Sequence, residues 1–158
     1  MAFPKSALKP PARKQPKAKT TPAPLTPKAA LRKYLSIWVD GKINLAERTF
    51  DPAIVRHHPP SIRPPEIAGL DAYKAFVAEF RTMHPDLRID VSETVSDGKY
   101  IAYRYTASAV NPATSERFSF SGMALSKFSK QGKIVEEWIT WDTFDLMVQV
   151  GLVPPRES

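Results

Sequence analysis

The sequence has no cysteine among its 158 residues. The chain therefore has no disulfide bonds, no thiolate nucleophile and no zinc site built on sulfur. It also lacks any apolar run near the roughly 20 residues that span a bilayer, and its N-terminus lacks the apolar segment of a secretory signal. We therefore expect a soluble, cytoplasmic protein without a membrane anchor.

Acidic residues are absent from positions 1–33, which hold nine of the 23 Lys and Arg. The net charge of +7 thus comes from the N-terminus. Residues 1–26 are also rich in proline and poor in large apolar side chains, so burial cannot offset their ordering entropy. We expect a disordered tail at 1–26 and one domain at 27–158. The tail is a solubilising extension, a targeting peptide or a weak polyanion-binding arm; with Phe3 as its one aromatic residue it predicts no specific nucleic-acid binding.

Helical patterns dominate the first half of the domain. Thr26 and Pro27 suit an N-cap and a first helical position, and apolar residues then recur at helical spacing until Gly41. A second, short helix is expected at 43–49. An amphipathic pattern predicts a third helix at 70–83.

Strand patterns dominate the second half. A short strand at 52–60 is closed by two prolines and followed by a proline-rich loop at 60–68. Four longer segments alternate apolar and polar residues, and Asp-Gly at 97–98 is a hairpin signal. Gly122 is expected at a bulge or bend, and a final helix at 143–150. The four long strands are expected at 86–95, 99–110, 117–129 and 132–142.

This order of elements predicts the α+β class, with helices packed on one face of a single sheet. Long strands with a glycine bend favour a curved antiparallel sheet that wraps over the N-terminal helices. Such a cone has an open end that can hold a ligand.

The last strand raises the question of which face is functional. Because side chains alternate along a strand, Ile134, Glu136, Trp138, Thr140 and Asp142 share one face, and Val135, Glu137, Ile139 and Trp141 share the other. Asp142 is therefore in phase with the indole of Trp138. Either Asp142 faces a pocket and moves a proton, or it caps the helix that follows.

Two adjacent histidines, His57 and His58, lie on a predicted strand and point to opposite faces. They cannot chelate a metal ion as a local pair, and we expect no metal site. His57 either polarises a carbonyl group or is a hydrogen-bonded structural residue. His84 lies in a turn, and we assign it no role.

Arg104 has two possible orientations on its strand. If it faces a cavity, it can stabilise an enolate or bind a carboxylate; if it faces outward, it pairs with Glu93 or Glu136. The outward orientation is favoured because the face that carries Ile101 is the more apolar one. Four aromatic residues are either pocket-lining or ordinary core. They are Tyr103, Phe118, Phe120 and Trp138.

Several stretches together resemble the polyketide-cyclase-like (SnoaL-like) branch of the nuclear transport factor 2-like superfamily. These stretches are "RHHPP", "GLDAYKAFVAEFRTMHPDLRIDV", "DGKYIAYRYTASA" and "GKIVEEWITWDTFDLMVQVGLVP". The resemblance implies a cone-shaped domain with an apolar pocket, commonly a homodimer through the outer sheet face. It also implies that Asp142 occupies the position of the general acid/base of the cyclases. In those enzymes a histidine on the preceding strand assists the aspartate, and the matching stretch "GMALSKFS" contains no histidine.

These observations predict a cofactor-independent acid/base enzyme, a cyclase, isomerase or dehydratase, that acts on a hydrophobic carbonyl or polyketide-like molecule. Asp142 would move the proton, and His57 or Arg104 would stabilise the oxyanion. The alternative is a module of the same fold that binds a small ligand or a partner without catalysis.

Overall fold

The computed structural model describes residues 24–60 and 62–155. The predicted disordered tail falls largely on residues 1–23, outside this range. The elements, in chain order, are α1 (Pro27–Trp38), the 3₁₀ turn η1 (Ile43–Leu45), α2 (Ala46–Thr49), β1 (Phe50–His57), β2 (Glu66–Ala68), α3 (Leu70–Met83), β3 (Arg88–Ser96), β4 (Tyr100–Val110), β5 (Arg117–Phe128), β6 (Ile134–Trp141) and α4 (Thr143–Gln149). The predicted helices and long strands are confirmed to within one or two residues.

The first helix begins where the sequence predicts. The Thr26 hydroxyl accepts a hydrogen bond from the backbone N–H of Ala29 at 3.3 Å, and Pro27 occupies the first turn. The cap satisfies an N–H group that has no partner within the helix. From there, α1 turns a fully buried face, including Tyr34 and Trp38, toward the sheet.

The sheet has the strand order β2-β1-β6-β5-β4-β3. The predicted antiparallel meander from β3 to β6 is confirmed. Two expectations are wrong. The sheet is mixed, because β1 lies parallel to β6, and the expected loop at 60–68 contains β2, which pairs with β1. Local sequence does not encode either pairing, since both depend on chain segments that meet only in the fold.

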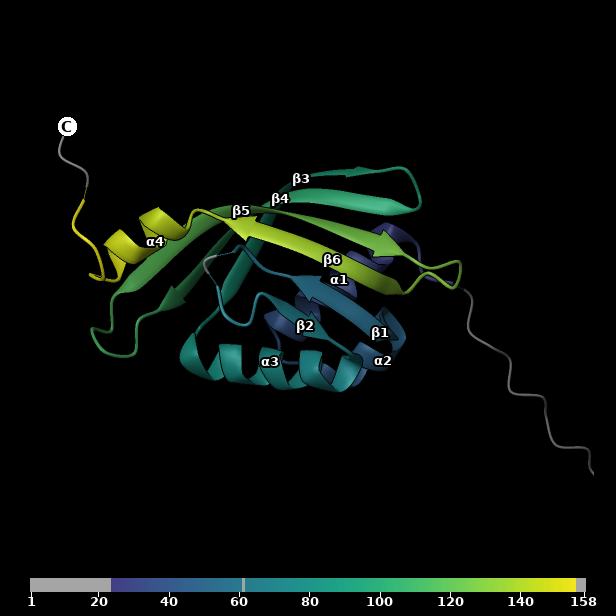
Figure 1. Cartoon of the computed structure of the whole chain (residues 1–158), viewed down its shortest axis with the longest axis horizontal. Coiled ribbons are helices and arrows are strands. Elements are labelled where there is room, and N and C mark those ends of the chain that lie inside the picture. Colours follow the sequence, from purple (N-terminus) through teal and green to yellow (C-terminus); the bar gives the residue numbers. More distant parts are fainter. Residues whose placement is uncertain (1–23, 61, 156–158) are drawn as a thin grey trace, which may run out of the picture.

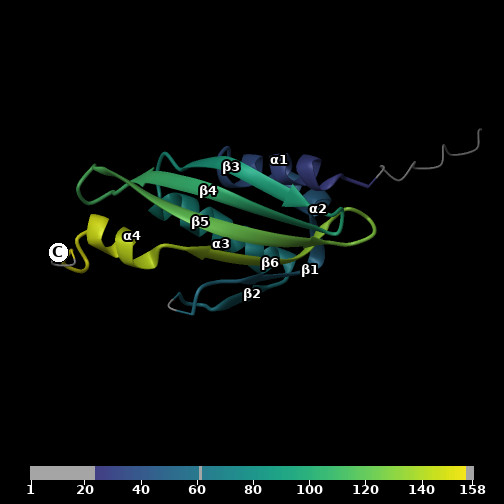
Figure 2. The same cartoon turned by 90° about the horizontal axis from the view of Figure 1, so that it is seen from above.

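The helices α1, α2 and α3 lie on one face of the curved, unclosed sheet, as Figures 1 and 2 show. The short helix α4 lies beyond the end of β6 and packs beside β5. The buried apolar residues gather between the sheet and α1 and α3. The opposite face of the sheet carries the more exposed side chains. The inner face is therefore the one that can enclose a ligand.

The alternation along β6 is interrupted near its start. Ile134 pairs with Phe128, but Glu136 pairs with Lys127, so one extra residue is inserted between them. An inserted residue of this kind reverses the phase of a strand. Consequently Ile134 and Glu137 are both buried, at 1% and 0% exposure, and the predicted grouping of Ile134 with the Trp138 face is wrong.

Gly122 does not mark a bulge, because the register runs through it without a shift, from Tyr105 on β4 to Trp141 on β6. A Cβ atom at this position would lie 2.3 Å from the carbonyl oxygen of Thr140 and 2.5 Å from the Tyr105 ring. Glycine is required here because two neighbours occupy the space of a side chain.

We expect Gly122→Ala to lower the free energy of unfolding by about 3 kcal/mol, since a backbone carbonyl and a packed ring must both move. Urea unfolding followed by tryptophan fluorescence measures this loss. Ser121→Ala, next to it on the exposed face, is the matched control and should change stability by less than about 0.5 kcal/mol. Equal stability of the two variants would contradict the close packing at Gly122.

Candidate functional site

An apolar pocket of about 250 Å³ lies between α1, α3 and the inner face of the sheet. Aromatic side chains form a large part of its wall, and Ile62, Arg63 and Met83 lie on a more exposed side. The aromatic lining residues are Tyr34, Trp38, Phe76, Phe80, Tyr105, Phe120 and Trp141. Such a wall suits a small ligand with a flat apolar body.

Arg56 is the charged residue deepest in this wall, and it is only 4% exposed. Its Nη1 donates to the carboxylate of Glu137 and, at 3.2 Å, to the hydroxyl of Tyr34. Its Nε donates to Nε2 of His58 at 2.9 Å. The guanidinium carbon lies 4.7 Å from the ring centroid of Trp38. These contacts fix the guanidinium on four sides.

Strand register brings the two charges together. Arg56 on β1 lies directly beside Glu137 on β6 in the parallel pairing, and both side chains point to the inner face. Along β1, buried Ile54 and Arg56 alternate with the less buried Val55 and His57. The ion pair is therefore a consequence of strand phase and of the β1–β6 pairing.

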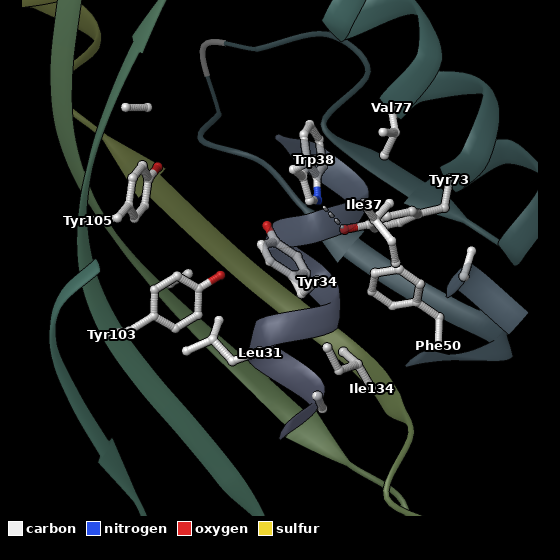
Figure 3. Close-up of a cluster of buried hydrophobic side chains, with 14 of the residues drawn as sticks. Leu31, Tyr34, Ile37, Trp38, Phe50, Tyr73, Val77, Tyr103, Tyr105 and Ile134 are labelled. Carbon is white, nitrogen blue, oxygen red and sulfur yellow. Dashed lines mark hydrogen bonds between the residues drawn. The ribbon is translucent and has the colours of Figure 1, made fainter. Parts of the chain in front are cut away.

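The network extends from Glu137 to the helices. Tyr73 on α3 donates to Oε2 of Glu137 at 3.2 Å, and Nε1 of Trp38 on α1 donates to the Tyr73 hydroxyl at 3.2 Å. Figure 3 shows this last bond and the hydroxyl of Tyr34 close to it. Polar groups from two strands and two helices are thus joined in one network inside the core, through Oε2 of Glu137. The other carboxylate oxygen, Oε1, is buried and has no hydrogen-bond partner among residues 24–60 and 62–155.

Burial and the Glu137 carboxylate raise the pKa of Tyr34 to about 12, so its hydroxyl stays protonated near neutral pH. For Arg56, burial is the largest influence and works toward a lower pKa, but the Glu137 carboxylate, Tyr34 and Tyr73 together outweigh it, and the pKa lies well above the usual value. The guanidinium therefore stays charged. A permanent cation and neutral hydroxyls define the electrostatics of the pocket.

The hydrogen bonds of Arg56 leave part of its donor capacity unused. Arginine has five N–H groups, and within residues 24–60 and 62–155 the bonds of Arg56 involve Nε and Nη1 but not Nη2. Trp141, also on the wall, has a buried Nε1 without an acceptor among these same residues. The pocket thus offers the unused N–H groups of Arg56 to an oxygen atom of a ligand, whereas Nε1 of Trp141 is enclosed by the protein.

Two histidines, His58 and His84, lie on the same side of the sheet as the pocket. Nδ1 of His58 contacts the carbonyl oxygen of Pro64 at 2.9 Å, and its Nε2 accepts from Arg56. His84, for which the sequence suggested no role, is a pocket-lining residue at the end of α3. Burial lowers the pKa of both imidazoles below the ordinary value, so both are mainly neutral near pH 7.

Asp142 lies outside the pocket lining and is exposed. Its Oδ1 accepts the backbone N–H of Asp145 at 2.9 Å, so it is the N-cap of α4, which was one of the two interpretations of this residue. It borders a separate, more open hollow with Phe144 and Pro155. The structure does not bring Asp142 to Arg56, and its catalytic role stays a prediction.

His57 and Trp138 lie on the outer face of the sheet. Their rings stack at a centroid distance of 5.2 Å, and Trp138 is 37% exposed. His57 lies between two carboxylates, with Nε2 3.1 Å from Glu136 and Nδ1 3.4 Å from Glu66. Neither ring lines the pocket. The catalytic role of His57, the substrate contact of Trp138 and the homodimer through this face stay predictions.

Arg104 points outward, as favoured from the sequence, and its Nη1 lies 3.2 Å from Oε2 of Glu93. The other predicted aromatic residues face inward. Phe120 lines the pocket, whereas Tyr103 and Phe118 are buried beside it without belonging to the lining. Tyr103 packs edge-on against Tyr34 at a centroid distance of 6.2 Å.

Sequence reasoning missed Arg56, Glu137 and His84. For the first two a signal existed: Arg56 alternates in phase with Ile54, and Glu137 is in phase with Ile139 and Trp141. Two opposite charges, each in the apolar phase of a strand, indicate a buried pair. For His84 the signal was its spacing, since it follows Phe76 and Phe80 at intervals of four residues and so continues one face of the predicted helix.

No three His, Cys, Asp or Glu side chains within residues 24–60 and 62–155 gather as ligands for a metal ion. No helix in the same part of the chain is long and apolar enough to cross a membrane.

Comparison with known proteins gives one family match. The model of the family described as SnoaL-like polyketide cyclase matches residues 28–150. A search of curated proteins found no match.

Solved structures share the fold. TsrD from Streptomyces laurentii superposes with a TM-score of 0.67 and 19% identity over 80% of this chain and 95% of TsrD. IdmH from Streptomyces antibioticus gives 0.68 and 20%, over 79% and 98% of the two chains. A SnoaL-like polyketide cyclase from Agrobacterium tumefaciens gives 0.66 and 20%, over 80% and 99%. At these identities the likeness shows a common fold.

Asp142→Ala should lower the free energy of unfolding by about 1 kcal/mol, because the first turn of α4 loses its cap. Thermal or urea unfolding measures the change, and Asp90→Ala, at an exposed strand position, is the control. A cap role is refuted if the two variants unfold alike.

Breaking the buried ion pair should have a larger effect. Arg56→Met leaves the Glu137 carboxylate buried without its cation, and we expect a loss of about 3–5 kcal/mol. The double variant Arg56→Met/Glu137→Leu should be more stable than Arg56→Met, because no unpaired charge remains. A urea-unfolding double-mutant cycle measures the coupling, and a coupling below about 0.5 kcal/mol would contradict a desolvated pair.

Proposed function

Because the chain belongs to the SnoaL-like polyketide cyclase family, we propose that it is a cofactor-independent acid/base enzyme that acts on a hydrophobic carbonyl compound. Cyclisation, isomerisation and dehydration of such compounds share one demand. A proton next to the carbonyl group must leave while negative charge develops on the carbonyl oxygen.

One observation carries this proposal: a buried guanidinium lies in the wall of an otherwise apolar pocket, with Nη2 unused by its partners in the described part of the chain. Donors that are held in place in a water-poor site stabilise developing oxyanion charge much more than water does. Arg56 is held by Glu137, Tyr34 and His58, so it needs no reorganisation when charge develops.

Charge balance explains how an apolar ligand can be accommodated beside a cation. Glu137 does not line the pocket but neutralises Arg56, so this guanidinium adds little net charge to the pocket in the ground state; the other cation of the lining, Arg63, lies on the more exposed side. When an enolate forms, the guanidinium is already aligned with it. This arrangement favours the transition state over the neutral substrate, which is the requirement for catalysis.

A second candidate function is ligand binding without catalysis. The observation that favours it is the position of Asp142, His57 and Arg104 outside the pocket lining. Under this alternative, Arg56 would only orient a carbonyl oxygen of the ligand.

The ketone 1-tetralone and its hydrocarbon counterpart tetralin serve as matched probes. We expect 1-tetralone to quench the fluorescence of the pocket tryptophans at a concentration roughly tenfold lower than tetralin. We also expect the protein to accelerate the uptake of deuterium at the α-carbon of 1-tetralone in D₂O, which NMR measures. Arg56→Lys retains the positive charge beside Glu137 but loses the planar donor pair, and it should slow this exchange about tenfold or more.

Binding of the ketone without faster exchange would favour the binding module, and equal binding of ketone and hydrocarbon would overturn the carbonyl site. If Asp142→Asn abolished the deuterium exchange and Arg56→Lys left its rate unchanged, the acid/base role would belong to Asp142. Urea unfolding of each variant shows that a lost activity is not a lost fold.

A further inference from the structure

The proposed function requires a group that takes the proton, and the residues predicted for it lie outside the pocket. Among the residues that line the pocket, His84 is the one with an imidazole side chain. Its position follows from helix geometry. Phe76, Phe80 and His84 succeed one another at intervals of four residues, so they lie on one face of α3 and its C-terminal cap.

Phe76 and Phe80 lie between His84 and Arg56, the group that we propose stabilises the anion. The guanidinium carbon of Arg56 lies 5.9 Å from the ring centroid of Phe76, and the Phe76 and Phe80 centroids are 6.0 Å apart. The His84 ring stacks on Phe80 at 4.0 Å with an interplanar angle of 18°. Arg56 and His84 therefore lie along one aromatic wall of the pocket.

The tautomer of His84 is set by its neighbour. Nδ1 lies 2.8 Å from the carbonyl oxygen of Phe80, which can only accept, so the hydrogen of the neutral ring is on Nδ1. Nε2 then carries the lone pair. Within residues 24–60 and 62–155, no group makes a hydrogen bond with Nε2.

The ring is also held in place. The backbone N–H of His84 donates to the same Phe80 carbonyl at 2.9 Å and closes the helix. Phe118 meets the ring edge-on at 6.0 Å, and the carbonyl of Pro85 accepts from Val110 at the start of the next turn. A fixed imidazole whose free nitrogen is a base suits proton transfer better than one on a mobile loop.

The other two histidines are engaged on both nitrogens. Nε2 of His58 accepts from Arg56 and its Nδ1 contacts Pro64, whereas His57 lies between Glu66 and Glu136 on the outer face. Burial also lowers the pKa of His84, which keeps the lone pair available near pH 7.

We propose that His84 is the general base of the pocket. Its Nε2 takes a proton from the carbon next to the ligand carbonyl: the C–H bond breaks, an N–H bond forms, and the electron pair moves to the carbonyl oxygen, where Arg56 stabilises the enolate. The imidazolium then returns the proton to the product. This inference rests on the proposed function, since it supplies the base for that reaction.

Alkylation tests the position of the lone pair without knowledge of the natural substrate. Phenacyl bromide is an aromatic ketone with a reactive α-carbon; an imidazole nitrogen forms a C–N bond with that carbon and bromide leaves. The chain has no cysteine to compete for the reagent. We expect peptide mass mapping to show His84 modified at least tenfold faster than His57 or His58, with 1-tetralone slowing the modification.

Proton transfer is tested with matched variants. His84→Asn retains a side-chain N–H for the Phe80 carbonyl but has no basic nitrogen, and it should reduce the deuterium exchange of 1-tetralone at least tenfold. Glu79→Gln, on the exposed face of the same helix and outside the pocket lining, should leave the exchange unchanged. Unfolding curves of both variants establish that they are folded.

The outcomes separate the two proposals. Exchange that continues at the wild-type rate in His84→Asn would overturn His84 as the base and leave the proposed function standing. Absence of exchange in the wild-type protein would overturn the proposed function and, with it, the need for a base. Modification of His84 no faster than His57 would contradict a free Nε2 in the pocket.

Discussion

The buried ion pair between Arg56 and Glu137 is the interaction on which the rest of the structure depends. It joins β1 to β6 where these strands run parallel, and its hydrogen bonds extend to α1 through Tyr34 and to α3 through Tyr73. Neither charge can remain alone in this core, because an unpaired buried ion costs several kcal/mol. The sheet, the two helices and the pocket are therefore coupled through a single polar network.

The same pair connects the fold with chemistry. Glu137 neutralises the guanidinium without occupying all of its donors, so a cation can form part of an apolar pocket and still offer hydrogen bonds to a ligand. The helix α3 adds His84 from its C-terminal end, fixed by its contacts with Phe80. Arg56 is placed by a strand and His84 by the cap of a helix, and the proposed stabilisation of an oxyanion requires groups that are fixed in this way.

Local patterns predicted most of the elements, and the reasons can be seen in particular residues. Thr26 and Pro27 start α1, Asp142 caps α4, and the alternation of β3 to β6 is visible in the chain. The parallel β1–β6 pairing, the strand β2 and the extra residue near Val135 were not predicted. Each of these depends on contacts between segments far apart in sequence, for which local periodicity has no signal.

Except at the start of β6, the sequence by itself determined which residues share a face along the strands; it also determined where the helices begin and that no thiol chemistry is available. For β6 it did not determine which of the two faces is covered, and this decided the site. The face with Trp138 is the outer one, whereas Glu137 is buried on the inner face and Trp141 lines the pocket. The alternation of side chains along a strand separates two faces but does not say which of them is buried. One face is removed from water only because α1 and α3 pack against it.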